Sequence, residues 1–301
     1  MTRGVTKTAL LPDRGVVKVA GEDARPFLNG LLTADISKVT PDVPRFAALL
    51  TPQGKIILDA IVAEAPAADG GGFFLDLPKA LAGPCVERLN FYKLRAKVIV
   101  ENLSETLAVM AVWAGDAMTD YGLCYRDPRL PTLGFRIMLP PHLAAAAAAD
   151  IGAALVPAAE FEAYRIALGV PRGGLDFGYG DAFPHEADMD QLNGVDFAKG
   201  CFVGQEVVSR MEHRGSARTR IVPVAYDGFP PEPGAAVTVA AKPVGTFGSS
   251  ADGRALAMLR LDRAADALAA GEPLIAGAVT LRLVKPDWIR FSFPGEGKAG
   301  E

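Results

Sequence analysis

The stretch KGCFVGQE, residues 199–206, carries the strongest local signal in the chain. It places Cys201, one of only three cysteines, between two glycines and leads into a run typical of a helix. Glycines beside a reactive residue permit positive φ angles and a close backbone approach. A thiol just before a helix faces unpaired N–H groups and the positive end of the helix dipole, which favour the thiolate. One interpretation is therefore an activated thiol.

The other interpretation is that Cys201 is a small buried side chain, because free cysteine is among the most buried residue types. Spacing alone favours this structural interpretation. Lys199 and Arg210 also have two interpretations. They either lower the pKa of Cys201 or bind an anion, or they belong to a solvated face.

The same eight residues resemble the signature of the YgfZ family, folate-binding proteins linked to iron–sulfur enzymes. Weaker similarities follow along nearly the whole chain. This family is similar in turn to the glycine-cleavage T-protein, whose ring of domains encloses a folate site. The resemblance implies an α+β, T-protein-like multi-domain ring around a central folate cavity, with a small C-terminal β-barrel. The weaker matches are Gly21 with Asp23, Gln53-Gly54-Lys55, residues 94–98, Arg165-Ile166, Gly169-Val170-Pro171, and Pro184 with Glu186.

The resemblance also implies a function. The chain would bind tetrahydrofolate or a derivative and support the assembly or repair of iron–sulfur clusters in client enzymes, including tRNA-modifying enzymes. Its partners would be those clients or assembly proteins, and Cys201 would be the functional thiol. Cys85 and Cys124 lie in unrelated segments, and four thiolates usually hold a cluster. A bound cluster would therefore need ligands from a partner or a small thiol.

Candidate folate contacts follow from the same resemblance, and several have a structural alternative. Gln205 and Glu206 either accept hydrogen bonds from a pterin or cap the following helix, where a carboxylate is favoured without any ligand. Asp59 either binds the pterin or belongs to a cross-strand network. The candidate contacts are Asp59, Glu186, Lys199, Gln205, Glu206 and Arg210.

The alternative function is that of a tetrahydrofolate-dependent aminomethyl- or methyltransferase. The T-protein has an acidic pair in the equivalent strand, whereas the matching positions here are Leu58 and Asp59, so one acid is missing. The T-protein also lacks the cysteine signature. Both departures argue against transferase activity. A third hypothesis is an interaction scaffold without a small-molecule ligand.

Composition excludes several classes of protein. The chain has 301 residues, of which 50% are hydrophobic, so we expect a folded protein of two or three domains. Its net charge of −4 gives no strong signal for direct nucleic-acid binding. The distant cysteines argue against a disulfide framework or a zinc site. Without an apolar run of about eighteen residues or a signal peptide, we expect no membrane partner and a cytoplasmic location.

The histidines and the basic residues beyond the signature suggest no metal site. The histidines have no metal-ligand spacing, and His185 is the only one near the signature. The basic run from Arg210 to Arg220 either binds carboxylates or RNA, or is an exposed connector, and we favour the connector because Glu212 interrupts the run.

We predict a mixed α/β folate-binding region over residues 1–215, with two subdomains, and a β-barrel domain over residues 216–301. Periodicity and turn residues divide the chain into elements. Asp23 is the expected N-cap of the first helix. Further helices are expected at 84–93, 143–155 and 158–168, a functional loop at 172–193 and a tail at 286–301. The expected strands are 15–20, 45–50, 56–64, 73–77, 97–100, 107–112, 134–139, 221–225, 236–240, 244–249, 255–261 and 279–284.

Overall fold

The computed structural model describes residues 5–215 and 217–295. Contacts divide the chain into two compact units, and the chain passes between them three times. The boundary that we expected at Ser216 lies outside the described residues, so that domain division stays a prediction. Unit 1 comprises Met1–Phe161 and Leu192–Gln205, and unit 2 comprises Glu162–Gln191 and Glu206–Glu301.

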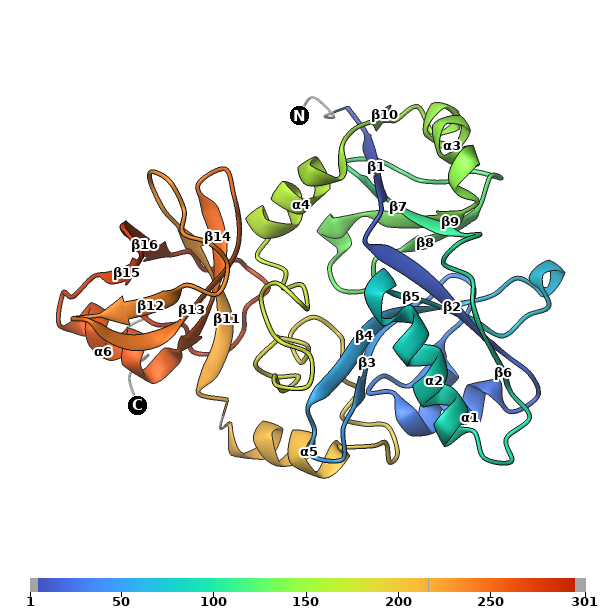
Figure 1. Cartoon of the computed structure of the whole chain (residues 1–301), viewed down its shortest axis with the longest axis horizontal. Coiled ribbons are helices and arrows are strands. Elements are labelled where there is room, and N and C mark those ends of the chain that lie inside the picture. The colour runs from blue at the N-terminus through green and yellow to red at the C-terminus, as the bar shows by residue number, and fades with distance from the viewer. Residues whose placement is uncertain (1–4, 216, 296–301) are drawn as a thin grey trace. The chain divides into compact units, whose positions relative to one another are not determined.

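The first sheet of unit 1 has the strand order β3-β4-β5-β2-β6 and is antiparallel throughout. Its strands are rich in valine, leucine and isoleucine, which suit a pleated, half-buried surface. Two helices, α1 (Ala24–Leu31) and α2 (Ala82–Tyr92), pack their apolar residues into the same core as this sheet (Figure 1). The strands are β2 (Arg14–Ala20), β3 (Arg45–Leu50), β4 (Ile56–Glu64), β5 (Phe73–Pro78) and β6 (Ile99–Asn102).

The second sheet of unit 1 has the order β10-β1-β7-β9-β8, and only the β1–β10 pair is parallel. The alanine-rich helix α3 (Ala144–Asp150) packs against its core. We expected this helix to continue to residue 155, but Gly152 adopts φ 63° and ends it. The strands are β1 (Lys7–Leu11), β7 (Ala108–Trp113), β8 (Leu123–Arg126), β9 (Phe135–Leu139) and β10 (Ala154–Leu155).

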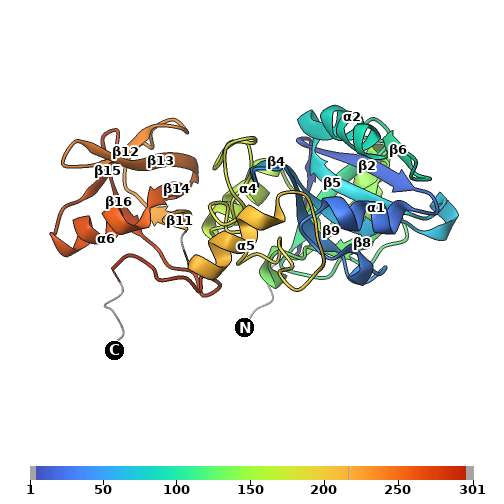
Figure 2. The ribbon, with the colours of Figure 1, turned by 90° about the horizontal axis from the view of Figure 1, so that it is seen from below.

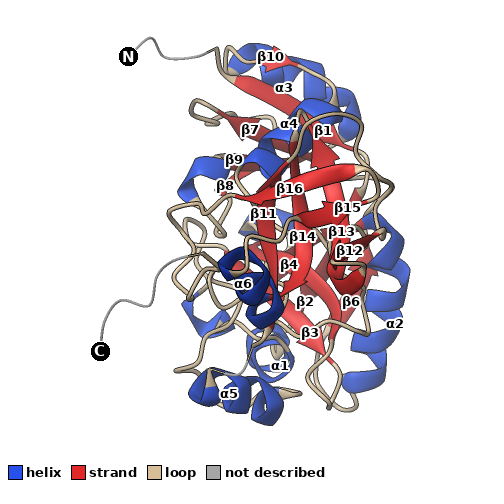
Figure 3. Cartoon of the chain, turned by 90° about the vertical axis from the view of Figure 1, so that its left-hand side faces the viewer, coloured by secondary structure: helices blue, strands red, loops and turns tan. Residues whose placement is uncertain are grey.

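Unit 2 contains a closed six-stranded barrel, with the order β11-β14-β13-β12-β15-β16. The helix α6 (Leu261–Ala269) buries Ala264 and Ala267 in the barrel core, and Figure 3 shows it beside the strands. Two more helices, α4 (Ala158–Ala167) and α5 (Gln205–Arg214), span positions where the chain changes unit. The barrel strands are β11 (Thr219–Ala225), β12 (Ala236–Val239), β13 (Lys242–Ala251), β14 (Arg254–Arg260), β15 (Leu274–Ala276) and β16 (Val279–Leu283).

The mixed α/β content and the closed barrel confirm the predicted α+β class with a small C-terminal barrel. The expected tail is wrong for residues 286–295, because Ile289 and Phe293 lie in the barrel core and Trp288 Nε1 donates to Leu168 O (2.9 Å). Residues 296–301 lie outside the described residues. Asp23 occupies the N-cap position of α1 as expected, but its carboxylate makes no capping bond and accepts instead from Lys97 N (2.8 Å). No sequence pattern predicted β1, β8, β10, β15 or α6.

Among residues 5–215 and 217–295, no helix combines the length and apolarity that crossing a membrane requires.

Candidate functional site

Cys201 is exposed, whereas Cys85 is buried and Cys124 is partly buried. The helix α5 begins at Gln205, so three residues separate the thiol from the helix. A helix dipole acts mainly within the first turn. The expected placement just before a helix is therefore wrong by most of a turn, and exposure is the property that distinguishes Cys201. Its position relative to a cleft stays a prediction.

Lys199 has a structural task close to this thiol. Its side chain is only 8% exposed, and its Nζ donates to the carbonyl oxygens of Asn29 (2.6 Å), Leu32 (2.6 Å) and Ala34 (2.9 Å). The carbonyls of Asn29 and Leu32 lie at the C-terminal end of α1, where backbone acceptors have no partner within the helix, and the carbonyl of Ala34 lies just beyond it. Burial lowers the pKa of Lys199 to about 8. The ammonium group therefore anchors the signature to α1.

A buried threonine fixes the segment just before Lys199. Thr33 Oγ1 donates to Gly194 O (2.5 Å) and accepts from Ala48 N on β3 (2.8 Å). The Thr33 carbonyl accepts from Asp196 N (3.0 Å). This one residue therefore joins the signature segment to the first sheet.

The two glycines of the signature differ in their tasks. Gly204 has φ 81°, and a Cβ there would lie 2.6 Å from Thr51 O and 3.1 Å from Gly54 Cα. It therefore packs closely on the β3–β4 turn, which contains the predicted Gln53-Gly54-Lys55 motif. A Cβ at Gly200 would meet no heavy atom within 4 Å, among the residues that the structure describes. Only Gly204 fulfils the expectation of a close approach.

Asp59 lies on β4, is 8% exposed and pairs with Ala48 of β3. Ala48 is also the residue whose N–H is held by Thr33. Unit 1 therefore brings together the strand that carries Asp59 and the anchor of the signature. Gln205, the last residue of this unit, is partly buried, and its N–H donates to Phe202 O (3.2 Å).

The other three candidates belong to unit 2. Glu186 is partly buried, and its carboxylate accepts from Phe183 N (2.8 Å), which closes the turn in which it lies. Glu206 and Arg210 lie four residues apart on α5, and both are exposed. They are therefore on one side of this helix.

Residues 218–291 match the family model for the CAF17 C-terminal beta-barrel domain. The chain is 31% identical over 314 residues to iron–sulfur cluster assembly factor IBA57 of Mus musculus, a similarity that covers 92% of this chain and 84% of the mouse protein. The chain belongs to the IBA57 family. Human IBA57 is 31% identical and covers 83% of this chain, which spans 76% of the human protein.

A fungal IBA57 homologue, from Mycosarcoma maydis, is 34% identical over 246 residues. The chain spans 60% of that relative's length. The expected family, YgfZ, is a relative of the IBA57 family, and the comparisons name IBA57. The expected cytoplasmic location is contradicted, because the fungal, mouse and human relatives are named as mitochondrial proteins. That expectation rested on the absence of a targeting pattern, and such an absence does not indicate a cellular location.

A solved structure confirms the T-protein-like fold of this IBA57-family chain. Aminomethyltransferase T of the glycine cleavage system from Bartonella henselae superposes with a TM-score of 0.73, covering 96% of this chain and 87% of the other. The two sequences are 16% identical, so the likeness concerns the fold. The ring of domains and its central cavity stay predictions.

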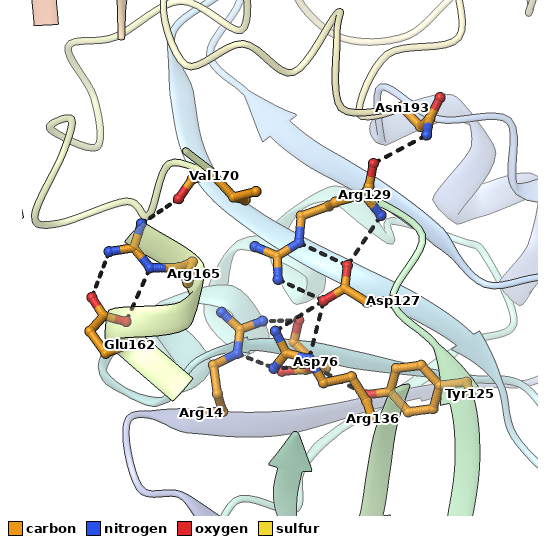
Figure 4. Close-up of polar contacts among 10 residues, drawn as sticks. All are labelled: Arg14, Asp76, Tyr125, Asp127, Arg129, Arg136, Glu162, Arg165, Val170 and Asn193. Carbon is orange, nitrogen blue, oxygen red and sulfur yellow. Dashed lines mark hydrogen bonds and ion pairs between the residues drawn. The ribbon is translucent and has the colours of Figure 1, made fainter. Parts of the chain in front are cut away.

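Unit 1 of this IBA57-family chain also contains a buried polar network that joins its two sheets (Figure 4). Asp76 on β5 accepts from Arg14 Nε (2.6 Å) and from the Tyr125 hydroxyl (3.1 Å). Asp127 accepts from Arg129 Nη2 (2.7 Å) and Arg136 Nη2 (3.2 Å). Arg136 Nη1 lies 3.6 Å from Asp76 Oδ2 and so connects the two acids.

Charge pairing dominates the electrostatics of this network. Burial raises the pKa of Asp127, but the guanidinium groups of Arg129 and Arg136 outweigh burial and hold it well below its ordinary range. Burial and the neighbouring Asp76 raise the pKa of Tyr125 well above its usual value. Asp127 is thus a paired anion, and the network joins the two sheets. Its residues are scattered through the sequence without a motif, so no local pattern predicted them.

A second cluster, in unit 2, contains the histidine that the sequence analysis singled out. His185 Nε2 lies 3.0 Å from Glu212 Oε2, and ligand atoms of His185, Asp190 and Glu212 fall within 4.8 Å of one another. Arg220, however, binds both oxygens of Asp190 (2.8 and 2.9 Å). A guanidinium at this carboxylate opposes a metal cation. Arg220 is also buried, so the expectation of an exposed basic connector is wrong for this residue.

Proposed function

We propose that this IBA57-family chain is an accessory factor in the assembly or repair of iron–sulfur clusters, and that Cys201 is its functional thiol. The observation that carries this proposal is the exposure of Cys201 on a segment that Lys199, Thr33 and Gly204 hold in place. An exposed thiol on a fixed segment is accessible to a cluster, a persulfide or a partner's thiol.

The cluster is cargo in this proposal. The chain supplies at most one thiolate, that of Cys201. Cys85 is buried in the core of unit 1, and Cys124 contributes to the core of the second sheet. Burial raises the pKa of Cys85 to about 12, which keeps this thiol protonated. The remaining ligands of a cluster would come from a partner protein or a small thiol. Client enzymes, with tRNA-modifying enzymes among them, are the proposed recipients.

The test is rescue of iron–sulfur enzyme activity in cells that lack this protein. Cys201→Ala is compared with wild type at equal abundance, and Cys124→Ala is the matched control because Cys124 is only partly exposed. We expect wild type and Cys124→Ala to restore activity and Cys201→Ala to fail. Equal rescue by Cys201→Ala would show that the thiol is structural.

We also propose that the chain binds a tetrahydrofolate. The fold likeness to aminomethyltransferase T and the buried Asp59 carboxylate support this proposal. A carboxylate can accept two hydrogen bonds from the amino-pyrimidinone edge of a pterin. Lys199 does not fit the role of a folate contact, because three backbone carbonyls engage its ammonium group. Glu186 already accepts a backbone N–H and is also a weak candidate.

Calorimetric titration with 5-formyltetrahydrofolate tests folate binding. We expect saturable binding by wild type and at least about tenfold weaker binding by Asp59→Asn, because that change weakens one charge-assisted contact. Lys199→Met tests whether Lys199 is a folate contact. If it is not, the folded variant should bind folate as wild type does. Turnover of an aminomethyl donor by wild type would instead favour the transferase function.

A further inference from the structure

The outer edge of the first sheet in unit 1 is β6, which pairs with β2 on one side only. Backbone groups of a strand point alternately to its two sides. Leu103 N donates to Val16 O (2.8 Å), so the odd-numbered residues of this strand face β2. Val100 and Asn102 therefore direct their backbone N–H and C=O groups outward. Within the described residues, no other backbone group bonds to them.

Large apolar side chains lie along the segment that leads into this edge. Phe91 in the last turn of α2, Leu94 in the connection and Ile99 at the start of β6 are 73%, 89% and 62% exposed. Figures 1 and 2 both show α2 and β6 side by side. Proteins normally protect a sheet edge, because unpaired backbone groups beside apolar side chains promote association. This edge is therefore suited to pairing with another chain.

Leu94 adds a second, independent observation. Its φ of 42° lies in the left-handed region, which is strained for a bulky residue. Strained residues persist where the surrounding structure or a function requires them. Here the strain presents an apolar side chain to solvent, where it contributes little to the core of unit 1.

The charge around the edge indicates the chemistry of a partner. From Arg88 to Asn102 the chain has four cationic residues and one acidic residue, Glu101, which lies opposite Lys18 of β2. Lys97 pairs with Glu22, and Lys93 donates to Val98 O. Arg88 and Arg95 are exposed and form no ion pair within the part of the chain that the structure describes. Arg88 and Arg95 are therefore available to form ion pairs with an acidic ligand.

We propose that this edge binds an extended segment of a partner protein in which acidic side chains alternate with apolar ones. The segment adds to β6 as a further strand, and its backbone pairs with Val100 and Asn102. Its apolar side chains cover Leu94 and Ile99, and its acidic side chains pair with Arg95. The proposal is independent of the role of Cys201.

The test uses the isotope-labelled full chain and two acetylated, amidated hexapeptides. One alternates valine with glutamate, and the other alternates valine with lysine. We expect the glutamate peptide to shift the amide resonances of Val100 and Asn102 and to slow their hydrogen exchange, and the lysine peptide to leave both unchanged. Equal effects of the two peptides, or no effect at these amides, would overturn the proposal.

Variants separate backbone pairing from apolar contact. Val100→Pro removes the outward N–H without removing a bond to β2, so the chain should fold and bind the glutamate peptide about fivefold more weakly. Leu94→Asn keeps a residue that tolerates φ 42° and removes the apolar surface, so it should also weaken binding. If Val100→Pro fails to fold, the Leu94→Asn variant tests the proposal in its place. Phe229→Ser is the matched control, at a residue of unit 2 that is 95% exposed, and should bind as wild type does.

Analytical ultracentrifugation tests whether a second copy of this chain occupies the edge. If the wild type alone is a dimer and Val100→Pro is a monomer, a second copy of this chain covers the edge, and the acidic partner is wrong. Weakening of peptide binding by Phe229→Ser to the same extent as by Leu94→Asn would likewise overturn the proposal.

Discussion

Among single residues, Lys199 has the most specific structural task, because it satisfies three carbonyl oxygens at and just beyond the end of α1. Methionine would keep the apolar stem and remove the donor. A buried polar group without a partner costs about 1–3 kcal/mol. We therefore expect Lys199→Met to lower the free energy of unfolding by about 3 kcal/mol, measured by urea denaturation. The exposed Lys242→Met should change it by less than about 0.5 kcal/mol.

The lowered pKa of Asp127 predicts how the stability of the fold depends on pH. Its pKa is held below the ordinary value of 3.8 by Arg129 and Arg136, so the folded carboxyl binds a proton less readily than the unfolded one. Its contribution to stability is thus present above pH 3.8 and is lost as pH falls further. We expect the free energy of unfolding to fall more steeply below pH 4 in wild type than in Asp127→Asn, measured in urea at several pH values. Parallel curves would show that Asp127 is not the responsible group.

At the scale of elements, the signature and the β3–β4 turn depend on each other through one glycine. Gly204→Ala places a methyl group 2.6 Å from Thr51 O at φ 81°, so both strain and a clash oppose it. We expect a loss of about 2 kcal/mol or more in unfolding free energy. Gly200→Ala in the same signature meets open space and should be nearly neutral. Thermal unfolding of the two variants side by side measures the difference, and equal melting temperatures would contradict the close approach.

At the scale of the whole molecule, the chain divides into two units, and Asp176 tests that division within unit 2. Its carboxylate accepts from Arg165 Nη1 (3.0 Å), Arg172 N (2.8 Å) and Ser249 N (2.8 Å), which ties the glycine-rich loop to β13. Asp176→Asn leaves the buried Arg165 with less compensation. We expect faster hydrogen exchange in the barrel and unchanged exchange in β3 and β4. Faster exchange in both units would mean that they unfold together.

Local patterns were sufficient to predict much of the fold. The strands β3 and β4 have the bounds that the sequence predicts, because apolar runs with strong β propensity flank a turn rich in polar residues and glycine. The barrel strands β11 to β14 and β16 were found from short apolar runs between proline and glycine turns. By contrast, β10 and β15 have only two and three residues, and so give little periodic signal.

The sequence by itself determined the α+β class and the C-terminal barrel, and it singled out the cysteine signature as the candidate site. Only the tertiary structure decided what those residues touch. Lys199 reaches carbonyls about 170 positions earlier in the chain, and Asp76 meets Tyr125 from another sheet. Such contacts depend on how distant segments pack, and no local spacing encodes them. Exposure is likewise a property of the folded chain, and it is what separates Cys201 from Cys85.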